Sequence, residues 1–210
     1  MSERRFYELP TSDQRRHAPA AARNVEAIGD VLADWLPSTG TVIEVASGTG
    51  EHVIALARRF ANLAWQPSES HPEALASIIA WRAAENLPNV ATPLLLDVRS
   101  ADWNIPFADA VLSINLVHIS PWDAALGLLA GAARLLRPGA PLVLYGPWFQ
   151  RGVDPAPSNL AFDADLRRRD PQWGIRQVEG FVGEAAARGF DFAEKRAMPA
   201  NNVMLLLRRR

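Results

Sequence analysis

A glycine turn flanked by acidic residues is the part of this sequence best suited to bind a charged small molecule. The stretch Glu44-Val45-Ala46-Ser47-Gly48-Thr49-Gly50 lies between a β-branched run and an amphipathic one. Glycines let the backbone turn sharply and let a ligand approach closely. Glu69 ends the next apolar run, where a carboxylate can accept hydrogen bonds from ribose hydroxyls. The pattern fits two ligands, a dinucleotide and S-adenosylmethionine.

The details of the turn favour S-adenosylmethionine. A dinucleotide site needs a third glycine three positions after Gly50, and Val53 stands there. Glu51, at the expected helix start, would repel a pyrophosphate. S-adenosylmethionine has no phosphate, and its sulfonium and ammonium groups suit an acidic surround. The acids near the turn are Glu44, Glu51, Glu69 and Asp97.

His118 is the histidine best placed to react. Ser120-Pro121-Trp122-Asp123 has the pattern of a helix start, with Ser120 as the N-cap and Asp123 completing a capping box. Residues 115–119 then form a loop at the carboxyl end of a strand, where ligands bind in doubly wound sheets. His118 is either a general base for the substrate or a neutral histidine that braces the loop. Both interpretations stay open at this point.

The elements that position these residues alternate along the chain. Uninterrupted apolar runs separated by amphipathic stretches predict a mostly parallel sheet with helices on both faces. Near the end, the runs 190–194 and 202–207 have no helix between them, which predicts an antiparallel edge hairpin. We therefore expect a Rossmann-like, doubly wound α/β fold. The earlier strands are predicted at 41–46, 63–66, 93–96, 110–115 and 142–145, and helices from Asn24 and at 51–60, 72–85, 126–136 and 177–188.

The chain is expected to form one domain after an N-terminal arm. Residues 1–22 are polar and rich in Pro and Ala, so we predict an arm there and a single domain over residues 23–210. The Pro-rich segment 147–175 is too long for a simple connection, and we expect it to cover the site.

Composition narrows the class of protein further. The 210 residues carry a net charge of −1, so no strong field recruits nucleic acid or an anionic membrane, and neither partner is expected. Cysteine is absent, which excludes disulfides, a thiolate nucleophile and a Cys-based zinc site. We expect no metal site. No apolar stretch is long enough for a signal peptide or membrane span, and we expect a cytoplasmic protein.

Several motifs together resemble the methyltransferase-like protein 26 family, a group of class I S-adenosylmethionine-dependent methyltransferases. They are "EVASGTGEH", "WQPSES", "NLVHISPW", "LYGPW", "PSNLAFDADLRRRDPQWGIR" and "MPANN". The resemblance runs from about Arg23 to the final strand. It implies a seven-stranded sheet with an antiparallel last strand and S-adenosylmethionine as cofactor.

The resemblance also implies roles for individual residues. The turn residues would line the methionine moiety, and Glu69 would bind ribose. The general pattern of the class I methyltransferase superfamily has glycine where this chain has Ala46, which matters if the backbone needs a positive φ there. The implied cofactor residues are Arg23, Asn24, Glu44, Ala46, Gly48, Gly50, Glu69, Asp97, Val98 and Asn115.

The sequence does not name the methyl acceptor, and we expect a small molecule or a protein. Candidate acceptor contacts are Trp122, Tyr145, Trp148, Asn159 and Asn201, although the two tryptophans are more often packing residues in such positions. Two other functions remain. A non-catalytic protein could bind the cofactor or a partner, and a nicotinamide-dependent oxidoreductase is disfavoured by the missing third glycine.

Overall fold

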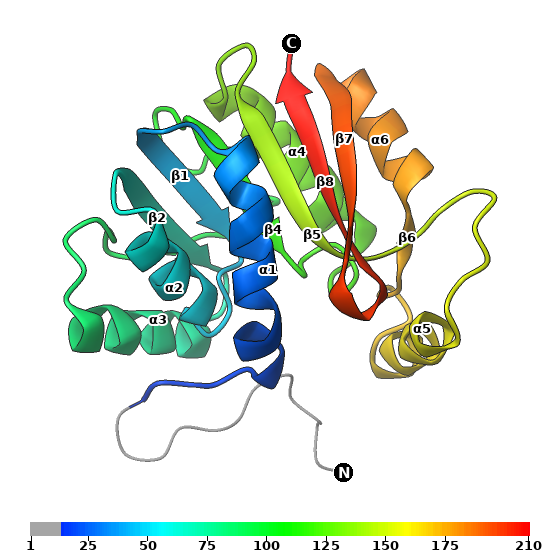
Figure 1. Cartoon of the computed structure of the whole chain (residues 1–210), viewed down its shortest axis with the longest axis horizontal. Helices are drawn as coiled ribbons and strands as arrows, with labels where there is room; N and C mark the ends of the chain where they lie inside the picture. The colour runs from blue at the N-terminus through cyan, green and yellow to red at the C-terminus, as the bar shows by residue number, and fades with distance from the viewer. Residues whose placement is uncertain (1–13) are drawn as a thin grey trace. The chain divides into compact units, whose positions relative to one another are not determined.

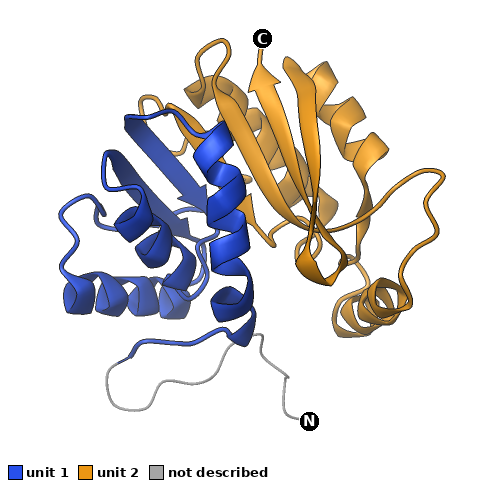
Figure 2. Cartoon of the chain, in the orientation of Figure 1, with its two compact units in different colours: residues 1–97 blue, residues 98–210 orange. Residues whose placement is uncertain are grey.

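The computed structural model describes residues 14–210, which form six α-helices, one 3-10 helix and eight strands. The chain divides into two compact units, residues 1–97 and 98–210 (Figure 2). Each unit is described separately below. The mixed α/β class with mostly parallel strands and an antiparallel C-terminal pair is confirmed. The expectation of one domain over residues 23–210 stays a prediction.

The first unit contains three parallel strands in the order β3-β2-β1 (Figure 1). They are β1 (Gly40–Val45), β2 (Leu63–Glu69) and β3 (Leu94–Leu95). The register pairs Gly40 with Leu63 and Glu44 with Pro67. The last four residues of β1 are all buried, as expected for a parallel strand covered on both faces. This register brings the carboxyl ends of β1 and β2 together.

Three helices accompany these strands, namely α1 (Pro19–Trp35), α2 (Glu51–Arg59) and α3 (Pro72–Glu85). α2 packs against both α1 and α3. The predicted start of α1 was wrong, because the helix begins at Pro19 rather than Asn24. Proline suits a first helical turn and the following alanines favour helix, so part of the expected arm is helical. Residues 1–13 of that arm lie outside the described part.

The second unit contains β4 (Ala110–Ile114), β5 (Pro141–Phe149), β6 (Arg176–Gln177), β7 (Phe190–Met198) and β8 (Asn202–Arg209). The order β4-β5-β8-β7 has a parallel first pair and two antiparallel pairs after it. The predicted C-terminal hairpin is therefore confirmed. The seven expected strands become eight because the two-residue β6 pairs with the end of β5.

The helices of this unit are α4 (Trp122–Leu135), α5 (Pro157–Arg169) and α6 (Val178–Ala187), and the 3-10 turn η1 (Pro199–Asn201) joins β7 to β8. The segment 147–175 is more regular than expected. Its first three residues complete β5 and thirteen others form α5. Asp163 and Asp165 form ion pairs with the Arg167–Arg169 triplet on α5, so the triplet is a solvated, paired helix face.

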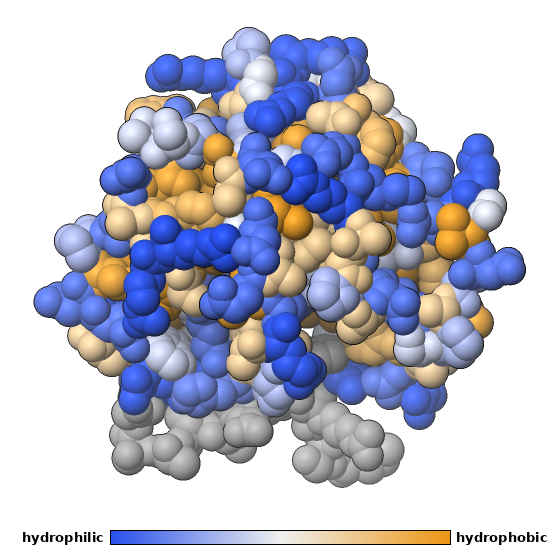
Figure 3. Space-filling model, viewed as in Figure 1, coloured by the Kyte–Doolittle hydropathy of each residue, from blue (hydrophilic) through white to orange (hydrophobic). Residues whose placement is uncertain are grey.

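Within residues 14–210, no helix combines the length and apolarity that crossing a bilayer requires. Polar and apolar residues are interspersed over the face shown in Figure 3. In the described part of the chain, the large apolar side chains that remain exposed belong to six separate sequence positions: Ile79, Leu95, Phe107, Val153, Leu160 and Phe192.

Candidate functional site

The glycine turn between β1 and α2 has three left-handed residues at alternate positions. Ala46 and Gly48 have φ of 57°, and Gly50 has φ of 93°. The turn is tied to β2, because the Ser47 amide donates to the Ser68 carbonyl over 2.8 Å. A Cβ on Gly48 would meet no heavy atom within 4 Å, so this side of the turn is open. The geometry leaves backbone accessible to a ligand.

Ala46 occupies a conformation that favours glycine. Its φ of 57° is positive, so the departure from the superfamily's glycine affects the backbone conformation here. A left-handed backbone costs an L-residue roughly 1–2 kcal/mol. Strain of this kind persists where the surrounding structure over-determines the backbone, and it is common at functional sites. The turn is therefore held in its shape by its neighbours rather than by the preference of Ala46.

Glu69, at the end of β2, is the acid that organises the turn. Its Oε2 accepts a hydrogen bond of 2.9 Å from the Gly48 amide. Its Oε1 accepts from the Ser70 amide, the Ser70 hydroxyl and the His71 amide. A carboxylate offers about four lone-pair positions, and among residues 14–210 only the Gly48 amide donates to Oε2. That oxygen can therefore accept a further bond from a ligand hydroxyl, as the predicted ribose role requires.

Glu44 is a buried acid in β1, with 1% of its surface exposed. Burial raises its pKa to about 8, and the nearby Glu69 carboxylate pushes in the same direction. Its Oε2 is buried and has no hydrogen-bond partner among residues 14–210. A buried carboxylate oxygen without a partner is stabilised by a cation or a hydrogen-bond donor beside it. Glu44 thus suits a positively charged ligand.

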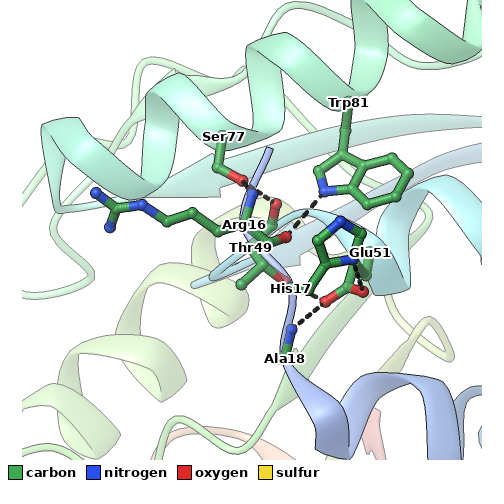
Figure 4. A network of polar contacts seen from close by, with 7 residues as sticks. All are labelled: Arg16, His17, Ala18, Thr49, Glu51, Ser77 and Trp81. Atoms are coloured by element: carbon green, nitrogen blue, oxygen red, sulfur yellow. Dashed lines mark hydrogen bonds and ion pairs between the residues drawn. The ribbon is translucent and has the colours of Figure 1, made fainter. Parts of the chain in front are cut away.

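Glu51 fills the N-terminus of α2, where a pyrophosphate would bind in a dinucleotide site. Its Oε2 accepts from the Ala18 amide and the Thr49 hydroxyl over 2.5 and 3.0 Å, and its Oε1 contacts His17 Nδ1 (Figure 4). A fixed carboxylate at this point repels phosphate. The contacts agree with the sequence-based preference for a phosphate-free ligand.

Two further predicted cofactor residues, Arg23 and Asn24, lie in α1. The Asn24 side chain is buried and its Oδ1 lies 2.8 Å from His52 Nε2 in α2. Burial lowers the pKa of His52 to about 4, so the ring is neutral and bridges the two helices. Arg23 is exposed on the same helix. His52 therefore packs between α1 and α2.

Asp97 and Val98 follow β3 and belong to different units. Asp97 is partly buried. Val98 is buried, and its carbonyl accepts a hydrogen bond of 3.2 Å from Trp103 Nε1. A Cβ on Gly127 would come within 2.6 Å of the same carbonyl. α4 therefore packs directly on the backbone at Val98, which fixes this part of the second unit.

In the second unit, His118 is buried with 5% of its surface exposed. Burial lowers the pKa of His118 to about 3, and the Arg176 guanidinium contributes in the same direction. The Phe162 ring of α5 packs edge-on at 5.7 Å. Within residues 14–210, neither ring nitrogen has a hydrogen-bond partner, so His118 is a neutral imidazole with unused polar atoms.

His118 and Asn115 converge on Gly146 of β5. A Cβ on Gly146 would lie 3.2 Å from His118 Nδ1 and 3.6 Å from Asn115 Oδ1. Asn115 has φ of 63°, which asparagine tolerates better than most residues, and its amide donates to the Tyr145 carbonyl. Sequence reasoning missed Gly146. Its place two residues before a tryptophan, at the end of a predicted strand, gave no signal of a close approach.

The loop after β4 is braced differently from the prediction. The capping box at Ser120 was wrong: the N-cap of α4 is Pro121, and no side chain caps it. The Ser120 hydroxyl instead donates to the Leu116 carbonyl over 2.8 Å. Arg176, a residue not predicted, donates to the carbonyls of Val117 and Ser120. The Gly174 amide donates to the His118 carbonyl, so the segment after α5 holds the His118 loop.

The predicted acceptor residues fall into two groups. Trp122 and Trp148 both pack against Phe181 of α6, at 6.3 and 5.2 Å between ring centroids. Tyr145 is buried in β5. The second group joins α5 to the β7–β8 hairpin, because Asn159 Nδ2 donates to the Asn201 carbonyl over 3.0 Å. The two tryptophans thus pack against α6, and the two asparagines join α5 to the β7–β8 hairpin.

A surface cleft of about 290 Å³ in the second unit was not predicted. Arg151, Gln177, Glu179 and Gly180 line it. The Arg151 amide donates to one carboxylate oxygen of Glu179. No candidate residue from the sequence lines this cleft.

Solved structures of similar fold match about nine-tenths of this chain. An O-methyltransferase family protein from Burkholderia thailandensis matches 90% of this chain and 57% of its own, at TM-score 0.76 and 19% identity. An O-methyltransferase family 2 protein from Planctomyces limnophilus, solved with apigenin, matches 91% and 58%, at 0.76 and 16%. The chain spans a little over half the length of these proteins. The predicted Rossmann-like methyltransferase fold is confirmed.

A third structure has a similar length to this chain. It is the putative methyltransferase in a complex with the Haloferax volcanii Trm112 methyltransferase activator, and the match covers 90% of this chain and 91% of that one at TM-score 0.72 and 14% identity. Family membership rests on a separate comparison. The model of a family described as "Protein of unknown function (DUF938)" matches residues 15–209, and the chain belongs to this family.

Proposed function

We propose that the protein is an S-adenosylmethionine-dependent methyltransferase and that its first unit binds the cofactor. The observation that carries the proposal is the hydrogen bond between the Gly48 amide and Glu69 Oε2. It joins the open glycine turn to a carboxylate oxygen that can still accept a hydrogen bond from a ribose hydroxyl. The resemblance to the methyltransferase-like protein 26 family supports the same function.

The charges near the turn fit this cofactor. Glu44 is buried, carries an oxygen without a partner among the described residues, and would be stabilised in its charged form by an ammonium or sulfonium. Glu51 stands where a dinucleotide would place phosphate. When bound, S-adenosylmethionine supplies a methyl group on a cationic sulfur. The protein then has to hold the reactants in line and exclude water.

We further propose that His118 accepts the proton of the methyl acceptor. Its neutral imidazole has the lone pair that a base requires. Because burial and Arg176 lower its pKa to about 3, the role also requires that the bound reactants raise this pKa toward the working pH. Because Gly146 has no side chain, the space beside His118 Nδ1 and Asn115 Oδ1 stays open on the side of β5. The roles predicted for Arg23, Asn24, Asp97, Val98 and Asn115 at the cofactor belong to this proposal, as does a cytoplasmic location.

The acceptor is proposed to be a small molecule or a protein. The O-methyltransferases of similar fold make an oxygen acceptor a reasonable first choice for screening, although this chain matches only part of their length. The alternative is a member of the fold that binds the cofactor without catalysis. Transfer of a labelled methyl group to any acceptor separates these two functions.

Thermal unfolding in the presence of ligands tests the central proposal. S-adenosylmethionine and S-adenosylhomocysteine raise the melting temperature, because a ligand that binds only the folded state stabilises it. NAD and NADP leave it unchanged. The absence of a shift with millimolar S-adenosylhomocysteine would contradict the proposal, and a shift with NAD alone would favour the oxidoreductase.

A further inference from the structure

The residues that precede α1 are fastened to the glycine turn (Figure 4). We propose that residues 15–18, here called the N-terminal clasp, set the shape of this turn and act as positioning residues for the cofactor. The part of the inference that concerns the cofactor rests on the proposed function. The part that concerns the shape of the turn stands on the contacts of the first unit alone.

Ser77 of α3 makes the first connection. Its hydroxyl accepts a hydrogen bond of 2.9 Å from the Arg16 amide and donates one of 2.8 Å to the Thr49 carbonyl. Ser77 is completely buried. Because one hydroxyl serves both partners, a displacement of the clasp changes the position of the donor that holds the turn.

Glu51 makes the second connection. Its Oε2 accepts from both the Ala18 amide of the clasp and the Thr49 hydroxyl of the turn. Its Oε1 lies 3.1 Å from His17 Nδ1. Thr49 is thus held at its carbonyl through Ser77 and at its side chain through Glu51. Two independent bridges reach the same turn residue from the same clasp.

Trp81 and the side chain of Arg16 fix the clasp itself. Trp81 Nε1 donates to the Arg16 carbonyl over 3.1 Å, and the His17 ring packs edge-on against the indole at 5.1 Å. The Arg15 guanidinium lies over the Trp81 ring, 4.9 Å from its centroid. The Arg16 side chain is 9% exposed and pairs with Glu73 of α3. Both clasp arginines therefore hold the segment on α3.

The glycine turn is tightly packed on the side that faces α3. A Cβ on Gly50 would come within 3.1 Å of the Ile78 Cα, so the turn lies directly against α3. α3 and the clasp thus support the turn at Thr49 and Gly50, in addition to the bonds that tie Ser47 and Gly48 to β2. If the cofactor binds this turn, clasp closure and cofactor binding share a coupling free energy, and each strengthens the other by the same factor.

Two substitutions open the clasp in different ways. Ser77→Ala removes the bridging hydroxyl, and Trp81→Phe removes the donor to the Arg16 carbonyl but keeps an aromatic ring. Glu85→Gln is the matched control. It weakens the ion pair between Arg58 and Glu85, which also joins α2 to α3 but at the ends remote from the turn. Melting temperatures verify that all three variants fold.

Two measurements are made on the full chain. Amide hydrogen exchange at Gly48 and Gly50 reports the turn without any ligand. Calorimetric titration with S-adenosylhomocysteine reports affinity. We expect both clasp variants to exchange these amides several-fold faster and to bind about three- to tenfold more weakly, which is the effect of losing one hydrogen bond. The control changes neither measurement.

The outcomes separate the clasp from the proposed function. Unchanged exchange at Gly48 and Gly50 in both folded variants overturns the clasp. Faster exchange with unchanged affinity for S-adenosylhomocysteine overturns its positioning role. If the unaltered protein does not bind S-adenosylhomocysteine at all, the proposed function fails, while the exchange result still decides whether the clasp shapes the turn.

Discussion

The Glu69 carboxylate and the Gly48 amide are joined by a hydrogen bond of 2.9 Å that connects the end of β2 to the glycine turn. Such a bond between a carboxylate and a backbone N–H is stronger than a neutral one. Glu69 is also the residue proposed to hold the ribose. On the proposed function, the shape of the turn and the binding of ribose would both depend on the Glu69 carboxylate.

Glu69→Gln should weaken both functions of this carboxylate. The amide group of glutamine cannot accept hydrogen bonds at both ends, so either Gly48 or the Ser70–His71 backbone loses its acceptor. We expect a loss of about 2 kcal/mol in the free energy of unfolding and at least tenfold weaker binding of S-adenosylhomocysteine. Urea denaturation and calorimetry measure the two. Glu26→Gln, at an exposed position of α1, is the control; equal affinity in both variants would place the ribose elsewhere.

Ala46→Gly should stabilise the protein. The substitution relieves the left-handed strain at φ of 57° but adds freedom to the unfolded chain, so the expected net gain is up to about 1 kcal/mol. Ala200→Gly at the tip of the β7–β8 hairpin is a matched comparison, because Ala200 has φ of 55°. Both variants should unfold at higher urea concentration. A lower midpoint for Ala46→Gly alone would mean that the methyl group packs usefully in the turn.

The fold was predictable where the hydrophobic periodicity agreed with the residues that start and end helices. α3 was found at its predicted bounds, because a proline begins it and an asparagine follows it. The C-terminal hairpin was also foreseen, since two apolar runs had no helix between them. The β6 strand was missed because two residues carry no period, and their pairing depends on where β5 ends.

The candidate site was predictable in its acids but not in its supports. Glu69 and Gly48 are marked by residue type and by their places after strands. The clasp could not be read from the sequence, because Ser77 and Trp81 lie more than fifty residues from Arg16 and look like ordinary helix residues. The capping box at Ser120 failed for a local reason: α4 begins one residue later than a Ser120 cap requires, and the Ser120 hydroxyl donates to the Leu116 carbonyl.

Glu44 should make stability fall as the solution becomes more alkaline. Its pKa rises from 4.5 to about 8 in the folded protein, so between these values the folded state binds more protons than the unfolded one. Stability from this group is fully present below pH 4.5 and is lost as the pH rises through about 8. Glu44→Gln keeps the shape of the side chain and removes the carboxyl group that titrates.

The difference in unfolding free energy between Glu44→Gln and the unaltered protein isolates this contribution. From pH 5 to about pH 8, we expect the unfolding free energy of the unaltered protein to fall relative to that of Glu44→Gln. Urea denaturation at each pH measures it. A difference that is constant over the range would show that Glu44 stays ionised in the folded protein, most simply by pairing with a cation.

Gly146→Ala should disturb His118. The new Cβ would lie 3.2 and 3.3 Å from His118 Nδ1 and Cε1, so the ring or β5 has to move. Overpacking of this kind costs about 1–3 kcal/mol. Gly183→Ala on α6 is the control, because a Cβ there meets nothing within 4 Å. Urea denaturation and the NMR signal of the His118 ring are the measurements; an unchanged ring signal would contradict the close approach.

Arg176→Gln should raise the pKa of His118. Burial is the larger cause of the low value of about 3, and the Arg176 charge is the smaller one, so removing that charge moves the pKa upward while leaving it below 6.5. A depressed histidine contributes stability that is present above pH 6.5 and lost as the pH falls toward 3. The variant should therefore lose less stability on acidification from this group, although it also loses the bonds to Val117 and Ser120.

An NMR titration of the His118 ring gives the pKa directly, and Arg168→Gln on α5 is the control. If the pKa is unchanged in Arg176→Gln, the guanidinium is screened from the ring, and burial alone keeps His118 neutral.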